Sequence, residues 1–169
     1  MQVSNPRMPC FSTAHTAVYE TPIGLLHVTY EQETVLSLNF HSGMTEAPVP
    51  SVCSDTVAQQ ILEYLNGERQ IFTVPYRLSG TPFQKLVWEA ISMIPYGLTS
   101  SYTEIAQAIG QPSSVRAVAS ACGKNPLLIL IPCHRIIGKD GTLHGYAGGN
   151  EMKQKLLKLE QQFSSPAKS

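Results

Sequence analysis

Three side chains with reactive or charged groups interrupt an apolar segment in the second half of the chain. Cys133, His134 and Arg135 lie between the apolar runs 127–131 and 136–137. A short apolar run of this kind is typical of a buried strand. Burying a thiol, an imidazole and a guanidinium costs free energy unless each group finds a partner. The segment therefore indicates a buried site with a chemical role.

Length, composition and cysteine spacing narrow the class of protein. The chain has 169 residues, of which 43% are apolar, and this is enough for one large domain or two small ones. No secretory signal opens it, and no apolar segment is long enough to span a membrane. Cys10, Cys53, Cys122 and Cys133 follow no metal-ligand or disulfide spacing. We therefore expect a monomer with reduced thiols, without a metal or other cofactor, in the cytoplasm, or in the nucleus if the organism is a eukaryote.

Formal charge is unevenly distributed along the chain, although the net charge is zero. Residues 1–80 hold three basic and seven acidic side chains, a net charge of −4, whereas residues 81–163 hold eight basic and five acidic ones, a net charge of +3. A basic second half beside an acidic first half favours a polyanion partner for the second half alone. Ordinary solvated charge explains the same pattern, so the asymmetry does not decide between the two.

Residues 1–80 have the pattern of a small mixed α/β domain. Segments of strand composition are followed by a loop at 42–51 that contains glycine and proline. Asp55 can cap a helix that Asn66 and Gly67 would end. The predicted elements are strands at 18–20, 25–30 and 35–40 and a helix at about 56–65. The best linker candidate is the segment 78–82.

Residues 81–163 are predicted to form a mostly helical domain. Thr81 can cap a helix that has Pro82 at its first position, a favoured site for proline. A closing helix is expected at 148–160, and the tail at 164–169 is expected to be disordered. Together with the first domain, this pattern predicts an α+β fold.

A helix-turn-helix pattern lies inside the second domain. A short helix at 103–109 is followed by a turn at 110–112 and by a second helix that Ser113 or Ser114 can cap. The second helix carries one cation, Arg116, among mostly small side chains. Small side chains let a backbone approach the narrow minor groove, where a single arginine can probe the duplex. An alanine-rich face that simply packs against the core gives the same sequence, and both interpretations stay open.

Cys133 and His134 have the chemistry of a nucleophile and its base. The reactive form of cysteine is the thiolate, and an adjacent base can generate it. In an extended strand the two side chains would point to opposite faces, so that a direct contact needs a turn or an intervening water. Glu160 is a candidate to orient the imidazole and to stabilise its cation. An inert buried cysteine and a hydrogen-bonded core histidine are the alternatives.

Several motifs of the second half together resemble those of a known family. Residues 132–135 match the active-site motif Pro-Cys-His-Arg of the O6-alkylguanine-DNA alkyltransferases, also called methylated-DNA–protein-cysteine methyltransferases. Residues 116–118 and 125–126 are similar to that family's recognition helix and to the asparagine hinge after it. Its remaining motifs resemble segments 83–88, 101–102 and 145–149, with Lys153, Leu156, Leu157 and Glu160. The resemblance covers residues 81–163, and the first half matches only loosely.

The resemblance implies direct, single-turnover repair of O6-alkylguanine in double-stranded DNA, and it leaves O4-alkylthymine open as a second substrate. Cys133 would attack the alkyl carbon and keep the alkyl group as a stable thioether, so that each molecule would act once. Glu160 would orient His134, which would take the thiol proton through a water. Asn125 would hold the turn that presents the cysteine, and Tyr102 would donate a proton or a hydrogen bond to the guanine ring.

The resemblance also implies how DNA and the damaged base are bound. The second helix would lie in the minor groove, the damaged nucleotide would be flipped out of the duplex, and Arg116 would fill the space that it leaves. The other DNA-binding residues would be Ser114, Ala117, Lys124 and Arg135. The base pocket would be lined by Ile136, His144, Tyr146 and Ala147, and the imidazole of His144 would narrow this pocket and disfavour bulky adducts.

Two other functions use part of the same pattern. A non-enzymatic sensor would bind alkylated DNA and recruit repair partners, but relatives of that kind lack the reactive cysteine that is present here as Cys133. A thiol hydrolase would need an oxyanion hole and would turn over its substrate. The intact mass of the protein after incubation with methylated DNA separates transfer, binding and hydrolysis.

Overall fold

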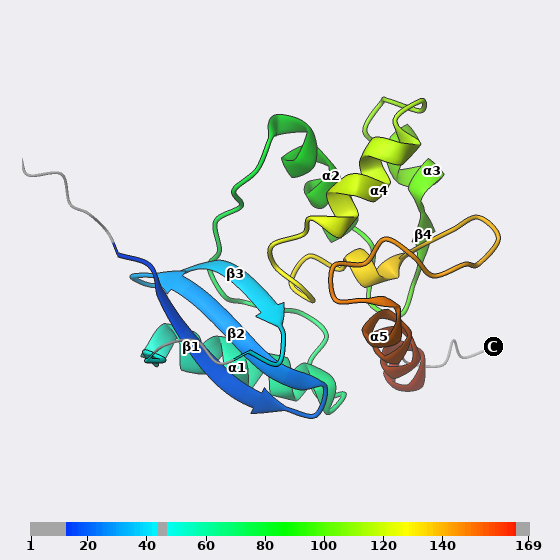
Figure 1. The fold of residues 1–169 in the computed structure, drawn as a ribbon. Coiled ribbons are helices and arrows are strands. Elements are labelled where there is room, and N and C mark those ends of the chain that lie inside the picture. Colours follow the sequence, from blue (N-terminus) through cyan, green and yellow to red (C-terminus); the bar gives the residue numbers. More distant parts are fainter. Residues whose placement is uncertain (1–12, 44–46, 165–169) are drawn as a thin grey trace, which may run out of the picture.

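The first part of the structure is a three-stranded antiparallel sheet with one helix packed on it. The computed structural model describes residues 13–43 and 47–164. The sheet has the order β1-β2-β3 and consists of β1 (His15–Thr21), β2 (Gly24–Glu31) and β3 (Thr34–Phe40). α1 (Val52–Leu65) lies across one face of this sheet (Figure 1). The three predicted strands and the helix are confirmed, each with longer bounds.

The packing of α1 follows from the alternation of side chains along the strands. Neighbouring residues of a strand point to opposite faces, and in β2 both Leu26 and Val28 are buried on the face toward α1. They belong to one apolar core with Val57 and Ile61 of α1. Burying such a side chain contributes about 1.5–3 kcal/mol relative to leaving it exposed. This core holds α1 in place, and with it Tyr64 in the last turn of the helix.

The start of α1 differs from the prediction. Asp55 does not cap the helix, because the N-cap is Ser51, whose Oγ accepts a hydrogen bond from the Ser54 N–H at 3.1 Å. The Ser54 Oγ in turn accepts from the Ser51 N–H at 2.8 Å, and this reciprocal capping box satisfies two N–H groups. Asp55 lies one turn inside the helix and accepts from the Tyr19 hydroxyl at 2.6 Å. The helix stops, as predicted, just before Gly67, whose φ of +79° is left-handed.

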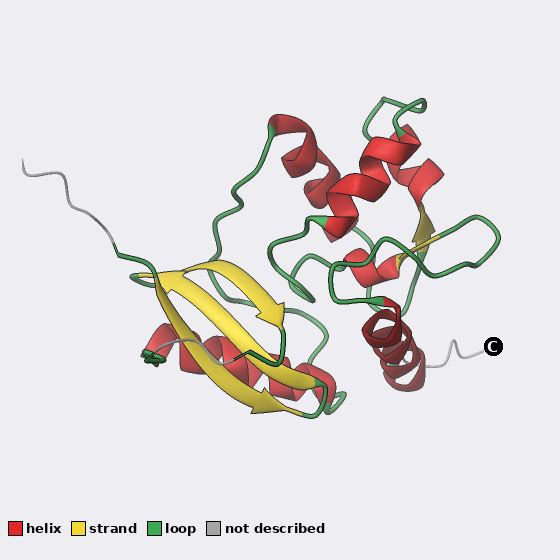
Figure 2. Ribbon diagram, in the orientation of Figure 1, coloured by secondary structure: helices red, strands yellow, loops and turns green. Residues whose placement is uncertain are grey.

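The second part of the structure is mostly helical (Figure 2). Its elements are α2 (Pro82–Ser92), β4 (Ser100–Ser101), α3 (Tyr102–Ala108), α4 (Val115–Gly123), the 3-10 helix η1 (Cys133–Arg135), β5 (Ile136–Ile137) and α5 (Asn150–Phe163). β4 and β5 pair in parallel. Thr81 caps α2 as predicted, since its hydroxyl oxygen accepts from the Gln84 N–H at 3.1 Å and Pro82 opens the helix. The fold is α+β, as the sequence predicted.

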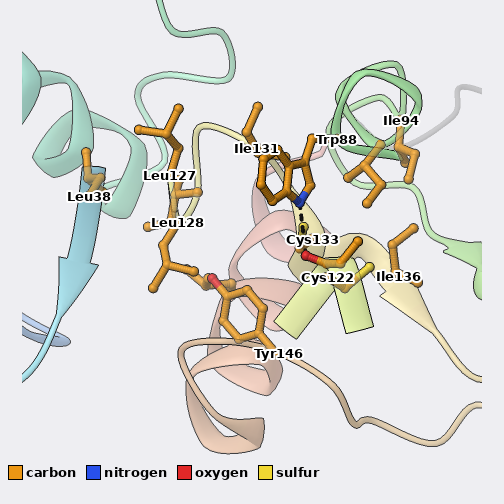
Figure 3. Packing of buried hydrophobic residues seen from close by; sticks show 14 of the residues in the cluster. Leu38, Trp88, Ile94, Cys122, Leu127, Leu128, Ile131, Cys133, Ile136 and Tyr146 are labelled. Carbon is orange, nitrogen blue, oxygen red and sulfur yellow. Dashed lines mark hydrogen bonds between the residues drawn. The ribbon is translucent and has the colours of Figure 1, made fainter. Parts of the chain in front are cut away.

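α3 and α4 form the predicted helix-turn-helix. They pack against each other across a turn in which Gly110 has a φ of +74°. Ser114 is the N-cap of α4, but its side chain makes no capping hydrogen bond. The indole N–H of Trp88 in α2 donates to the Ala121 carbonyl at 2.9 Å and so fixes α4 against the core (Figure 3). Held in this way, α4 exposes Arg116 to solvent.

Main-chain hydrogen bonds join β3 to the segment that precedes η1. The Leu38 N–H donates to the Pro126 carbonyl at 2.8 Å, and the Leu128 N–H donates to the Leu38 carbonyl at 3.0 Å. Leu38 and Leu127 thereby form a parallel bridge between the two parts of the structure. The sheet and the segment that precedes η1 are thus held in one fixed relation. The division into separate domains at residues 1–80 and 81–163 stays a prediction.

α5 begins and ends later than the sequence predicted. It runs from Asn150 to Phe163 instead of 148–160, and it follows Gly149, whose φ is +89°. The predicted disordered tail at 164–169 lies outside the described residues except for Ser164, whose N–H donates to a carbonyl of the last turn of α5 at 2.8 Å. Within the part of the chain that the structure describes, no helix has the length and apolar character needed to cross a bilayer.

Candidate active site

The apolar segment 127–137 does not form the continuous strand that its composition suggested. Leu128 and Ile131 form a bridge across a tight turn, and η1 follows directly. In this turn Ile129 has a φ of 72°, a conformation that is strained for a β-branched residue. Pro132, which has no N–H to give to a strand ladder, separates the turn from η1. Only the last two residues of the segment pair as a strand, in β5.

The side chain of Asn125 holds this turn from inside. Its Nδ2 donates to the Ile131 carbonyl at 2.8 Å, and its Oδ1 accepts from the Leu127 N–H at 2.9 Å. The amide therefore bridges the two ends of the turn, and it is itself buried. An asparagine at this position can hold the backbone that presents Cys133, which is the role that the sequence resemblance assigned to it.

Cys133 carries its thiol inside the protein. Its side chain is 1% exposed and lies in the apolar core beside Cys122 and Ile136 (Figure 3). Burial raises the pKa of the Cys133 thiol well above its usual value, and the neighbouring Cys122 thiol acts in the same direction. The positive charge of Lys153 and a hydrogen bond with the Asn125 side chain oppose this rise. The resting thiol is therefore protonated, so a nucleophilic sulfur here needs a base.

His134, the next residue in η1, is fully buried and has one paired and one unpaired ring nitrogen. Its Nε2 lies 2.7 Å from Oε1 of Glu160. Burial lowers the pKa of His134, and the hydrogen bond and charge of Glu160 only partly offset this effect. The imidazole is then neutral at neutral pH, with its proton on Nε2. Nδ1 keeps a free lone pair, and it has no hydrogen-bond partner among the described residues.

Glu160 in α5 is the carboxylate that the sequence analysis paired with His134. It is 1% exposed, and its oxygens also accept from the Arg135 guanidinium at 2.8 and 2.9 Å and from the Gly97 N–H at 3.2 Å. Burial acts to raise the pKa of Glu160, but the hydrogen bonds and charges of His134 and Arg135 outweigh it and lower the pKa to about 2. The carboxylate is therefore charged at neutral pH and can only accept hydrogen bonds.

The position of Arg135 conflicts with its predicted role as a DNA contact. The residue is 7% exposed, and besides its bonds to Glu160 it donates from Nη1 to the Ile94 carbonyl at 2.7 Å. Its guanidinium also lies over the Tyr96 ring, 5.7 Å from the centroid. A guanidinium held in this way does not reach a phosphate at the surface. Arg135 instead keeps Glu160 charged, a role that sequence cannot distinguish from that of a free surface arginine.

Lys153 is a buried cation to which the sequence analysis assigned no role. Its Nζ donates to the His144 carbonyl at 3.0 Å and lies 3.5 Å from the Tyr102 hydroxyl, which donates to the same carbonyl. Burial lowers the pKa of Lys153. Helical spacing could have revealed this residue, because Lys153, Leu156 and Glu160 form the buried face of α5 at positions i, i+3 and i+7.

The predicted base-pocket residues differ in their exposure and in their contacts with Cys133, His134 and Tyr102. The Ile136 N–H donates to the Cys133 carbonyl, and the Tyr146 ring lies 6.3 Å from the His134 ring. His144 packs edge-on against Tyr102 with ring centroids 5.3 Å apart. Burial raises the pKa of Tyr102 to about 12, so its phenol keeps a proton that it can donate. The fourth predicted pocket residue, Ala147, is exposed.

Apart from the buried arginine of η1, the predicted DNA-binding residues lie on or next to α4. Arg116 and Ala117 are exposed at the start of the helix, Ser114 is half-buried at its N-cap, and Lys124 is exposed directly after it. The opposite face of the same helix carries Cys122, beside the Cys133 thiol. One helix therefore separates the solvent-facing cation from the buried sulfur.

Among residues 13–43 and 47–164, no group of three or more histidine, cysteine, aspartate or glutamate side chains could hold a metal ion. The rings of His27 and His41 stack with centroids 3.5 Å apart, but two imidazoles alone do not make a ligand set. Cys10 lies outside the described residues.

The second part of the chain matches a described DNA-binding domain. Residues 82–162 match the family model for the DNA binding domain of 6-O-methylguanine DNA methyltransferase. The helix-turn-helix and the buried cysteine beside it thus lie in a domain of the methyltransferase class.

The chain belongs to the methylated-DNA–protein-cysteine methyltransferase family. The member from Methanosarcina acetivorans is 41% identical over 150 residues, which cover 85% of this chain and 96% of that protein. The inducible member from Bacillus subtilis is 56% identical over 108 residues, which cover 64% of this chain and 60% of that longer relative. The structure is also similar to that of the Mycobacterium tuberculosis protein OGT in complex with DNA, with a TM-score of 0.82 and 39% identity over 90% of this chain and 96% of the other.

Proposed function

We propose that this protein repairs DNA by moving the alkyl group of O6-alkylguanine to Cys133 in a single, irreversible event. The observation that carries the proposal is a buried thiol, Cys133, followed in the chain by a buried imidazole whose Nε2 is held by a carboxylate and whose Nδ1 has a free lone pair. The names of the relatives, which specify methylated DNA as the donor and a protein cysteine as the acceptor, support the same chemistry. O4-alkylthymine, whose alkyl group is also bonded to an exocyclic oxygen of the base, is a second candidate substrate.

The reaction needs a proton acceptor on one side of the alkyl carbon and a proton donor on the other. Nδ1 of His134 takes the Cys133 proton, directly or through a water, and Glu160 stabilises the imidazolium that results. The sulfur then attacks the alkyl carbon, a C–S bond forms, the C–O6 bond breaks, and its electron pair stays on the base. Tyr102 donates to the purine ring and so improves the leaving group.

Lys153 adds a function to this mechanism that the sequence analysis did not include. A buried ammonium near Cys133 favours the thiolate, because it lowers the pKa of the thiol. It also donates to the His144 carbonyl alongside Tyr102. When Tyr102 turns from this carbonyl to the base, Lys153 keeps the carbonyl hydrogen-bonded. The tyrosine can therefore change partners without leaving a buried oxygen unsatisfied.

DNA binding is assigned to the exposed side of α4. In this proposal the helix lies in the minor groove, the damaged nucleotide is flipped out, and Arg116 fills the vacated stack. Ser114 and Ala117 lie against the groove, and Lys124 contacts the phosphate backbone. The protein acts as a monomer on double-stranded DNA, in the compartment that holds the DNA.

Intact mass spectrometry tests the proposal. The protein is incubated with a duplex that contains one O6-methylguanine, and the protein and the DNA are then weighed. Transfer predicts one added methyl group, located on Cys133 by peptide mapping, and a repaired guanine. Binding without modification would point to a sensor, and released product with unmodified protein would point to a hydrolase.

Arg116→Ala should slow alkyl transfer from duplex DNA by about tenfold or more, because the flipped state loses the side chain that fills the stack, and each 1.36 kcal/mol is a tenfold change in rate. The thermal midpoint should stay unchanged, because Arg116 is exposed. Single-turnover rates on duplex and on single-stranded DNA measure the effect, which should be confined to the duplex. Lys155→Ala, at an exposed cation of α5, is the control. An equal loss on both substrates would contradict the assigned role.

His144→Gly should widen the base pocket and raise the rate on benzyl adducts relative to methyl adducts. The physical reason is that the imidazole packs edge-on against Tyr102 at the mouth of the proposed pocket. The ratio of the two transfer rates, measured for the wild type and the variant, checks the prediction. An unchanged ratio would remove His144 from the residues that select the size of the adduct.

A further inference from the structure

The helix of the first part reaches into the buried charge network of the second part. Tyr64, in the last turn of α1, is fully buried, and its hydroxyl donates to Oε1 of Glu160 at 2.7 Å. The same hydroxyl lies 3.3 Å from Nε2 of His134. These contacts join residues that are 96 and 70 positions apart in the sequence. The tyrosine therefore contacts both members of the histidine–carboxylate pair without being near either in the chain.

The direction of each proton in this network follows from the charge of the carboxylate. Glu160 is ionised at neutral pH and can only accept, so both the Tyr64 hydroxyl and His134 Nε2 donate to its Oε1. Burial raises the pKa of Tyr64 far above its usual value, with Glu160 adding to the rise, so the phenol does not lose its proton. Tyr64 thus acts as a permanent donor that shares one carboxylate oxygen with the imidazole.

We infer that Tyr64 is a positioning residue that sets the basicity of His134 by sharing the carboxylate oxygen of Glu160 with it. This inference rests on the proposed function of His134 as the base for Cys133. A hydrogen bond to the carboxylate disperses its negative charge and so weakens its attraction for an imidazolium. It also fixes the carboxylate in the plane in which Nε2 can donate, which leaves Nδ1 free for the thiol proton. The first part of the chain thereby contributes to the proposed chemistry.

Other charged and titratable groups around the imidazole must be considered when its titration is read. They are Arg135 in η1, Lys153 and Glu160 in α5, and Tyr146 in the segment before α5, while Tyr96 contacts Arg135 and Tyr64. Among the described residues that hydrogen-bond to the carboxylate, Tyr64 is the one from the first part of the chain. Its hydroxyl can be removed while the ring, which contacts Phe72, stays in place.

The test compares Tyr64→Phe with a matched control, Tyr19→Phe. The Tyr19 hydroxyl also donates to a carboxylate, that of Asp55 at 2.6 Å, but on the exposed side of α1. The titration of the His134 ring is followed by NMR in the unreacted protein. In Tyr64→Phe the Glu160 carboxylate loses one hydrogen-bond donor and attracts the imidazolium more strongly. The pKa of His134 should therefore rise by about half a unit or more. In Tyr19→Phe it should not move.

A second variant keeps the Tyr64 hydroxyl in place and makes it a stronger hydrogen-bond donor. Tyr64→3-fluorotyrosine has a more acidic phenol and is a stronger donor, so the pKa of His134 should fall. A purely structural role for Tyr64 predicts no shift, or shifts of the same sign in both variants, and either result would overturn the inference. This second variant keeps the test decisive even if Tyr64→Phe does not fold.

The rate of alkyl transfer is a further readout that separates this inference from the proposed function. The acid limb of the rate against pH should move to higher pH in Tyr64→Phe and stay in place in Tyr19→Phe. If the wild type transfers no alkyl group but the histidine titrations shift as described, the proposed function fails and the inference on Tyr64 stands. If the wild type reacts and the titrations do not shift, the inference alone fails.

Discussion

Cys133→Ala is expected to abolish alkyl transfer completely while leaving DNA affinity close to that of the wild type. The variant removes the sulfur to which the proposed C–S bond forms, while the neighbouring Cys122 thiol stays in place. Affinity should persist, because the exposed Arg116 lies on the opposite side of α4 from the sulfur and Lys124 is exposed directly after that helix. Intact mass after incubation with methylated duplex measures transfer, and fluorescence anisotropy on the same duplex measures affinity.

The matched control for this variant is Cys53→Ala. Cys53 is a free, half-buried thiol in the first turn of α1, far along the chain from the site. The Cys53→Ala protein should accept one methyl group on Cys133 at the wild-type rate. A methyl group on any cysteine in Cys133→Ala would refute the assignment of the acceptor.

The DNA affinity of both proteins should weaken as salt rises. The logarithm of the binding constant should fall against the logarithm of the salt concentration with a slope of about −0.9 per phosphate contact.

Glu160→Gln should cost about 3–5 kcal/mol of folding free energy and should nearly eliminate transfer. Removing one member of a buried ion pair leaves the other charge uncompensated, and here the Arg135 guanidinium would remain buried without its carboxylate. The amide would also present a donor to His134 and Tyr64, which both donate to this position. Urea denaturation gives the free energy of unfolding, and a single-turnover assay gives the rate.

Glu151→Gln in the same helix is the control, because its pair with Lys155 is exposed and should contribute no measurable stability. Equal stability losses in the two variants would contradict the buried network.

The wild type should also lose stability as the pH falls from neutral to about 2. Both His134 and Glu160 have a lowered pKa in the folded state, so the unfolded chain binds more protons than the folded one as the pH falls from each group's ordinary pKa to its lowered one. In Glu160→Gln the part of this loss below about pH 4.5 should be smaller.

Local rules predicted the fold where the signal lies in neighbouring residues. Thr81 and Pro82 marked the start of α2, and alternation marked the strands of the sheet. They were wrong at α1, where two serines form the capping box in place of Asp55. They were also wrong for the apolar run before η1. There, the amide of Asn125 satisfies backbone groups that a strand ladder would otherwise pair.

The candidate site was predictable only in part, because its charges are distributed over distant segments. The pairing of His134 with Glu160 followed from the motifs of the second half, and the atoms lie at hydrogen-bond distance. The burial of Arg135 and the contribution of Tyr64 depend on how α1 packs, and no local pattern encodes that packing. The spacing of Lys153 in α5 places it on the buried face with Leu156 and Glu160, but a lysine is not normally expected at a buried position.

The bridge between β3 and the segment before η1 has an evolutionary consequence. It consists of amide-to-carbonyl bonds at Leu38, which any residue other than proline can make, and it therefore places little demand on side-chain identity. The sheet can diverge in sequence while its attachment geometry persists. This agrees with a family model that matches only residues 82–162, and with a structural similarity that extends over 90% of the chain. Distant relatives should accordingly be recognised in their amino-terminal halves by shape before they are recognised by sequence.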